Sequence, residues 1–262
     1  MPIETDNYWS ATRHPWACVL FVLPLLAIYE VGLYATGTTG PEELRNGADA
    51  WLRAGLSEIG VSPIYGAPCL LLIILFLWGL VRHDGRPTDK FGTWVGMAVE
   101  SSAYALVLLG LSQGLWHVLL RADNILGQPS QRIALLQWSA HASRSTPEPL
   151  WGQIVSYLGA GIYEETLFRL LIFAGLLRLF SWTEMRTSFN TILAVVASAL
   201  LFAGAHHLGP NGDPFNAYVF SFRTFAGVYF AWLYLARGFG IAVGAHAGYD
   251  VLVGLILQQS HG

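Results

Sequence analysis

The sequence predicts an all-α protein, a polytopic transmembrane helix bundle with about seven spans, six or eight also being compatible with it. Two observations predict this class. Of the 262 residues, 54% are hydrophobic and only 12% are charged, against about 25% charged in a typical soluble domain. The apolar residues also gather in runs long enough to cross a bilayer, with short polar turns between them.

The predicted spans follow one another along the chain. They are Trp16–Tyr34, Ile64–Val81, Phe91–Leu120, Leu150–Phe180, Phe189–His206, Phe215–Ala236 and Phe239–Gln258. The fourth run exceeds the ~20 residues that one crossing needs. We therefore expect an interfacial elbow first and the span proper from near Leu158. Pro41 and the acids after it start a further short helix, to about Glu58, which we expect to lie at the membrane interface.

The charge and the cysteine content indicate the environment and the partners of the protein. The net charge is −3 with a single lysine, Lys90, so the expected partners are membrane lipid and not nucleic acid. Cys18 and Cys69 lie in apolar runs, where they are expected to be small buried residues without a disulfide. Basic residues in the turns at 82–90, 178–188 and 236–238 favour a cytoplasmic N-terminus. The composition suits a bacterial inner membrane.

The stretch Gly161-Ile-Tyr-Glu-Glu-Thr-Leu-Phe-Arg169 places two acids and an arginine inside the fourth run. Charges at membrane depth are costly, and they tend to face a protein interior and mark a functional site. Glu165 and Arg169 are spaced i,i+4 and are expected to pair on one helix face. Glu164 is rotated by about 100° from Glu165, which leaves it free for chemistry.

Two later spans carry further polar residues with the same spacing. Phe202 and His206 end the fifth span, and His246 and Asp250 share a face of the seventh. With Glu164 they supply carboxylates and imidazoles, the groups that water activation and oxyanion stabilisation need. The same set also suits zinc. A span starting near Leu158 would put all of them in one leaflet, the outer one, whereas a start at Leu150 would leave His206 fitting poorly.

Taken in order, these motifs resemble a known family. Glu164-Glu165-x-x-x-Arg169, Phe202-x-x-x-His206 and His246-x-x-x-Asp250 are similar to the three motifs of the CPBP intramembrane proteases, relatives of the CAAX-processing endopeptidase that trims prenylated proteins. The resemblance covers roughly Leu150 to the C-terminus. It implies a catalytic helix core at residues 150–262, with N-terminal spans and surface segments at 1–149, in a single membrane domain. It also implies peptide-bond hydrolysis within or at the edge of the bilayer.

The resemblance also implies a role for each motif residue. Glu164 would be the general base, His206 would position the water or shuttle its proton, and His246 and Asp250 would form the oxyanion site. The supporting residues would be Glu165, Arg169 and Phe202.

The family's third motif often ends in Asn, and here it ends in Asp250. Because an ionised Asp cannot donate a hydrogen bond, Asp250 is protonated, orients His246 or ligates a metal. The family has been described both as metalloproteases and as metal-free glutamate proteases. We expect no cofactor, since no HExxH-type pair is present. Zinc is the alternative, and its ligands would be Glu164, His206, His246 and Asp250.

Other functions remain compatible with these residues. A proton-coupled transporter or channel would use Glu164, Glu165, His206, His246 and Asp250 as a relay. A non-catalytic immunity or scaffold protein could also keep a protease-like fold. For a protease, the substrate would be a protein or peptide with a membrane-associated segment. Candidates are prenylated proteins, exported peptides and proteins whose C-terminal membrane anchor is removed, and an outer-leaflet site favours the last two. Elsewhere, Glu30 or Glu100 is expected to pair with Arg223.

Overall fold

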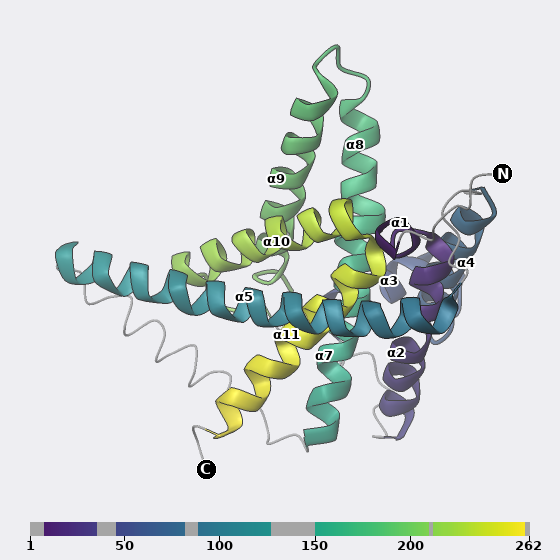
Figure 1. Ribbon diagram of the computed structural model, residues 1–262, viewed down its shortest axis with the longest axis horizontal. Coiled ribbons are helices and arrows are strands. Elements are labelled where there is room, and N and C mark those ends of the chain that lie inside the picture. Colours follow the sequence, from purple (N-terminus) through teal and green to yellow (C-terminus); the bar gives the residue numbers. More distant parts are fainter. Residues whose placement is uncertain (1–7, 36–45, 82–88, 127–149, 210–211, 260–262) are drawn as a thin grey trace.

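The computed structural model describes residues 8–35, 46–81, 89–126, 150–209 and 212–259. This part of the chain is helical without strands, which confirms the all-α prediction (Figure 1). The elements are α1 (Tyr8–Ala11), α2 (Pro15–Ala35), α3 (Gly47–Glu58), α4 (Gly66–Val81), α5 (Lys90–Leu126), α7 (Leu150–Glu165), the π-helix η1 (Thr166–Phe173), α8 (Ala174–Phe180), α9 (Thr187–Ala205), α10 (Ala217–Arg237) and α11 (Phe239–Gln259).

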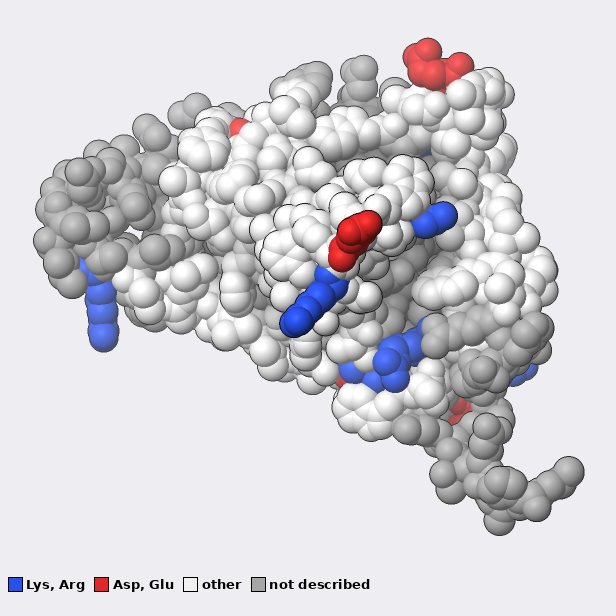
Figure 2. Space-filling view, turned by 90° about the horizontal axis from the view of Figure 1, so that it is seen from above, with Lys and Arg blue, Asp and Glu red and all other residues white. Residues whose placement is uncertain are grey.

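Five of these helices are long and apolar enough to cross a membrane. The candidate spans are Pro15–Ala35, Lys90–Leu115, Thr187–Ala205, Ala217–Arg237 and Phe239–Ile256. The shorter apolar helix α4 coincides with another predicted span. Many large hydrophobic side chains on these helices point outward, as expected where lipid is the surrounding medium. The face seen in Figure 2 is largely uncharged. The chain is therefore an integral membrane protein built as a polytopic helical bundle.

The remaining predicted span is a composite helix, α7–η1–α8, which we call the motif helix (Leu150–Phe180). The expected elbow before Leu158 is absent, because α7 is regular from Leu150 onward. This part of α7 packs against α2 inside the protein, where Val155 is fully buried. A Cβ at Gly159 would lie 2.1 Å from the Tyr29 ring. The irregular segment comes later, at η1, directly after Glu165.

Two helix pairings bring the three motifs together. In Figure 1, α9 runs beside α8 along one half of the motif helix and ends near its middle. Helix α11 packs against both α7 and α5. Gly161 allows this approach, because a Cβ there would lie 2.7 Å from the backbone nitrogen of Ala247 on α11. The end of α9 and the middle of α11 therefore meet the motif helix at the same level.

Helix α3 buries a polar face against α7. Asp49 and Arg53 are buried and form an i,i+4 ion pair of 2.5 Å, whereas Trp51 is 38% exposed. Asn46 caps the helix, since its side chain accepts a hydrogen bond from the Asp49 backbone N–H. The predicted start at Pro41 lies outside the described residues.

Three ion pairs inside the bundle differ from those predicted. Arg223 pairs with Asp213 at 2.5 Å, not with Glu30 or Glu100. Those two acids bind other arginines, Glu30 with Arg53 at 2.6 Å and Glu100 with Arg237. The prediction was wrong because hydrophobic runs do not show which helices are neighbours. The prediction for the cysteines holds only in part: Cys18 is buried, whereas Cys69 is exposed on α4, and neither forms a disulfide.

Candidate active site

Glu164 lies at the end of α7 and faces two imidazoles from other helices. Its Oε2 is 3.6 Å from Nε2 of His206 and 3.8 Å from Nε2 of His246. These separations are too long for direct hydrogen bonds, and at such distances a bridging water is the usual link between polar groups. Oε2 is buried and has no hydrogen-bond partner among the described residues.

Glu165 points the other way and pairs with Arg169. Its Oε2 lies 3.1 Å from Nε of Arg169, and neither side chain is exposed to solvent. Arg169 also donates a hydrogen bond to the Gly227 carbonyl of α10. The predicted i,i+4 pair is therefore present. The two adjacent acids differ in their surroundings, Glu165 being held by a cation and Glu164 facing the imidazoles.

His246 connects these two acids. Its Nδ1 lies 3.0 Å from Oε1 of Glu165. Because Glu165 is paired with Arg169 and a carboxylate only accepts hydrogen bonds, this Nδ1 carries the donated hydrogen. The imidazole stacks on Phe230, with ring centroids 4.4 Å apart. Its Nε2 is thereby aimed at Glu164 and at Oδ2 of Asp250, which lies 3.6 Å away.

His206, the C-terminal cap of α9, is held by a hydrogen bond to its own helix. Its Nδ1 lies 2.8 Å from the Phe202 carbonyl oxygen, which can only accept, so Nδ1 is the donor and Nε2 presents a lone pair to Glu164. The Phe202 ring contacts both imidazoles edge-on, with centroids 4.9 Å from His206 and 5.9 Å from His246. Arg169 lies over the same ring at 5.4 Å. The Phe202 ring thus helps to set the distance between the two imidazoles.

The structure brings together the four residues predicted to be catalytic, and we call them the candidate site: Glu164, His206, His246 and Asp250. They meet although the motif helix begins at Leu150, a start that was expected to leave His206 fitting poorly. That expectation was wrong because α9 descends only to the middle of the motif helix, where its C-terminal cap, His206, meets Glu164 (Figure 1).

Comparison with protein families supports the sequence resemblance. Residues 146–252 match the family described as Type II CAAX prenyl endopeptidase Rce1-like. This segment, less than half of the chain, is thus similar to the Rce1-like domain of the CPBP family, and it contains all three motifs. No curated protein and no solved structure matched the chain.

Histidine and carboxylate side chains such as those of the candidate site can also bind metals. Among the described residues, no three His, Cys, Asp or Glu side chains form a group that could hold a metal ion in this structure. The expectation of a cofactor-free site, with zinc as the alternative, stays a prediction.

One charged pair beside the site was not anticipated as part of it. Arg223 of α10 pairs with Asp213, whose backbone N–H donates a hydrogen bond to the carbonyl of His206 at 2.8 Å. Nη2 of Arg223 donates to Oδ2 of Asp213, whereas its Nη1 is buried without a hydrogen-bond partner among the described residues. The signal in the sequence was an arginine inside an apolar run, two turns after a turn-rich loop that contains an acid.

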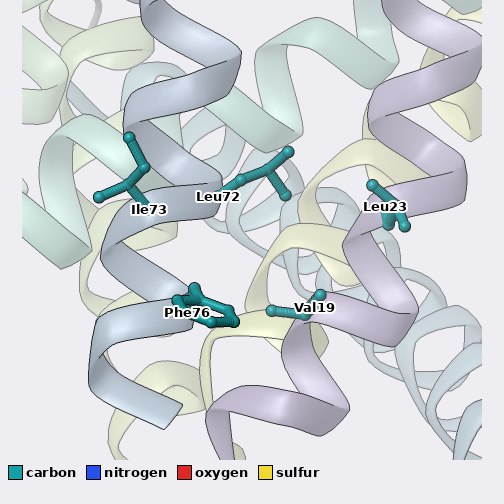
Figure 3. Close-up of a pocket in the computed structure, with 5 residues that line it drawn as sticks. All are labelled: Val19, Leu23, Leu72, Ile73 and Phe76. Atoms are coloured by element: carbon teal, nitrogen blue, oxygen red, sulfur yellow. The ribbon is translucent and has the colours of Figure 1, made fainter. Parts of the chain in front are cut away.

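An apolar groove lies elsewhere, between α2 and α4 (Figure 3). Its volume is about 360 Å³, and its lining residues are Val19, Leu23, Leu72, Ile73 and Phe76. All of these side chains are hydrocarbon, and none belongs to the three motifs. The groove therefore lies apart from the candidate site and contributes no reactive group to it.

Proposed function

We propose that this protein is an intramembrane endopeptidase in which Glu164 and His206 activate the attacking water. It would hydrolyse a peptide bond in a membrane-proximal or C-terminal segment of a protein or peptide. The observation that supports this proposal most strongly is the convergence of an unpaired, buried carboxylate oxygen on two imidazole Nε2 atoms, at 3.6 and 3.8 Å. Such an arrangement can hold one water between a base and a hydrogen-bond acceptor.

The reaction needs only groups of this chain and one water. Glu164 Oε2 takes a proton from the water while the His206 Nε2 lone pair accepts its second hydrogen as a hydrogen bond, which orients the oxygen lone pair. The water oxygen bonds to the carbonyl carbon, and the carbonyl oxygen becomes an oxyanion on the side of His246 and Asp250. Glu164 then gives its proton to the amide nitrogen, and the C–N bond breaks to release an acid and an amine.

The surroundings of the two adjacent acids explain why Glu164, and not Glu165, would be the base. Glu165 is occupied by Arg169 at 3.1 Å and by His246 at 3.0 Å, so a water cannot reach a free oxygen there. Its role in this proposal is to hold His246 through Nδ1, which aims Nε2 at the reacting groups. Arg169 and Phe202, which contact each other, support the positions of Glu165 and His246.

The proposed setting is a bacterial inner membrane with the N-terminus in the cytoplasm. Substrates would be exported peptides or proteins that lose a C-terminal membrane anchor, with prenylated proteins as a further class. We also propose that the reaction is metal-free, with zinc held by Glu164, His206, His246 and Asp250 as the alternative. Activity that survives prolonged chelation and metal-free dialysis supports the first choice, and activity restored only by zinc supports the second.

The proposed function is tested with the full chain in proteoliposomes and a quenched fluorescent peptide that ends in an apolar segment. Glu164→Gln keeps the shape of the side chain but removes the base, so cleavage should fall to background. The matched control is Glu184→Gln, the same change in an exposed loop, which should retain full activity. A folded Glu164→Gln protein with full activity would contradict the proposal. Proton flux without cleavage would instead support the transporter hypothesis.

A further inference from the structure

The candidate site is rich in hydrogen-bond acceptors. His206 and His246 each donate through Nδ1, to the Phe202 carbonyl and to Glu165, so their Nε2 atoms are acceptors whenever the rings are neutral. Glu164 and an ionised Asp250 are acceptors as well. An oxyanion needs donors aimed at the position where its charge develops. With neutral imidazoles and ionised carboxylates, the four side chains of the candidate site do not supply such a donor.

Two arginines beside the candidate site, Arg169 and Arg223, have a buried Nη1 without a hydrogen-bond partner among the described residues. Arg169 is fully buried over the Phe202 ring, whereas Arg223 is partly exposed and is therefore the one that a substrate can reach. Its guanidinium is held on one edge, where Nη2 donates to Oδ2 of Asp213 at 2.5 Å. Nη1 is buried and has no hydrogen-bond partner among the described residues, whereas 16% of the Arg223 side chain as a whole is exposed. A guanidinium is always charged and presents its donors in a rigid fork. A buried N–H left without an acceptor costs free energy, which suggests that a substrate atom completes it.

Asp213 fixes the position of this arginine relative to the catalytic residues. The Asp213 backbone N–H donates to the His206 carbonyl at 2.8 Å, and its own carbonyl lies 2.8 Å from Nδ1 of His207. The loop that orients Arg223 is therefore bonded directly to the residue that would position the water.

We propose that Arg223 is a catalytic residue whose Nη1–H binds the carbonyl oxygen of the scissile bond and stabilises the oxyanion. This inference rests on the proposed function, since it assigns one further group to the same reaction. As water adds to the carbonyl carbon, the oxygen gains negative charge and its hydrogen bond to the guanidinium shortens. When the C–N bond breaks, the oxygen returns to a neutral carbonyl. Arg223 donates throughout and transfers no proton.

The test measures kcat and KM for Arg223→Met, Arg223→Gln and Arg223→Lys in proteoliposomes. The probe is the same quenched peptide, prepared both as the free acid and as the C-terminal amide. Removing one oxyanion donor lowers kcat by about 100- to 1,000-fold, so Arg223→Met should show this loss on both peptides with KM nearly unchanged. Arg223→Lys should lie between, because a lysine keeps the charge but cannot serve Asp213 and the substrate with one rigid fork.

A matched control lies on the same helix. Arg237→Gln also breaks a buried ion pair of α10, with Glu100, but Arg237 ends this helix and contacts α1 and α5 instead of the candidate site. It should lower thermal stability while leaving kcat per folded molecule near the wild-type value. This control separates the loss of a buried arginine from the loss of an oxyanion donor.

Each other outcome overturns the inference in a recognisable way. A folded Arg223→Met protein with wild-type kcat shows that the oxyanion has another donor. A rise in KM confined to the free-acid peptide shows that Arg223 binds the terminal carboxylate of the substrate and not the oxyanion. In both cases an inactive Glu164→Gln protein leaves the proposed function standing. An active Glu164→Gln protein rejects the proposed function itself.

Discussion

Two adjacent residues of α7 enter two different buried polar clusters. The Tyr163 hydroxyl donates to Oε1 of Glu30 at 2.6 Å and receives a hydrogen bond from Arg53. We call the group around Arg53 the α3 cluster (Tyr29, Glu30, Asp49, Arg53 and Tyr163). Glu164 enters the candidate site. Both clusters lie inside the helix bundle, and both combine carboxylates with cationic or aromatic partners.

The clusters differ in how completely their hydrogen bonds are formed. Every nitrogen of the Arg53 guanidinium donates at 2.5–3.2 Å, to Asp49, to Glu30 and Tyr163, and to the carbonyls of Pro63 and Ile64. In the candidate site, Oε2 of Glu164 and the neighbouring Nη1 of Arg223 have no partner among the described residues. Buried polar groups are normally satisfied, and exceptions often mark catalytic sites. We therefore expect the α3 cluster to stabilise the fold and the candidate site to carry out the reaction.

The largest stability effect is expected at Arg53. Arg53→Met leaves the buried Asp49 and the partly buried Glu30 without their cation, and removing one partner of a buried pair costs about 3–5 kcal/mol. Denaturant unfolding in mixed micelles measures this free energy. Glu164→Gln is the counterpart in the other cluster, and it should leave stability unchanged or slightly increased. Equal losses in the two variants would remove the distinction between the clusters.

Glu165→Gln should show an intermediate effect, because Glu165 adjoins the candidate site and is paired with both Arg169 and His246. The change leaves Arg169 charged at 0% exposure, and we expect a loss near the lower end of the same range, about 3 kcal/mol. Activity should fall as well, since His246 loses its ionised acceptor. The two readouts are the unfolding free energy and kcat. An active and stable variant would show that Glu165 does not hold His246.

Gly161→Ala tests whether the contact between α7 and α11 sets the geometry of the site. An added Cβ would lie 2.7 Å from the Ala247 backbone nitrogen and 2.9 Å from the Val243 carbonyl oxygen. Overpacking of this kind costs about 1–3 kcal/mol, and the displacement of α11 would move His246 and lower kcat. Gly175→Ala is the control on the motif helix, because its Cβ would meet no atom within 4 Å. It should gain about 0.5–1 kcal/mol.

The smallest effect is expected for Tyr163→Phe. This change removes one hydroxyl from the α3 cluster, and we expect a loss of about 0.5–1.5 kcal/mol for one hydrogen bond, because Oε1 of Glu30 keeps its hydrogen bond from Arg53. The kcat should stay at the wild-type value although the next residue is Glu164. A large loss of activity at unchanged stability would place Tyr163 in the catalytic machinery and weaken the division between the clusters.

The sequence allowed the helical class, the apolar runs and the Glu165–Arg169 pair to be predicted, because each follows from composition or from spacing within one helix. The Arg223–Asp213 pair joins a helix to the loop before it, ten residues away, and the fixed spacings within a helix do not give the path of that loop. The contact of Glu165 with His246 could not be predicted either, since it depends on which helices become neighbours. The fully bonded α3 cluster was missed for the same reason. Its members come from α2, α3 and α7, and within this cluster only the Asp49–Arg53 contact is local in sequence.

The π-helix within the motif helix has a consequence for the angular register of the protein. An α-helix fixes the direction of every side chain relative to every other, whereas a π-helical segment, with i→i+5 hydrogen bonds, adds a residue and resets this phase. The face of α7 that meets α11 and the face of α8 that meets α9 are thus set independently. The π-helical segment therefore separates the side-chain directions of α7 from those of α8.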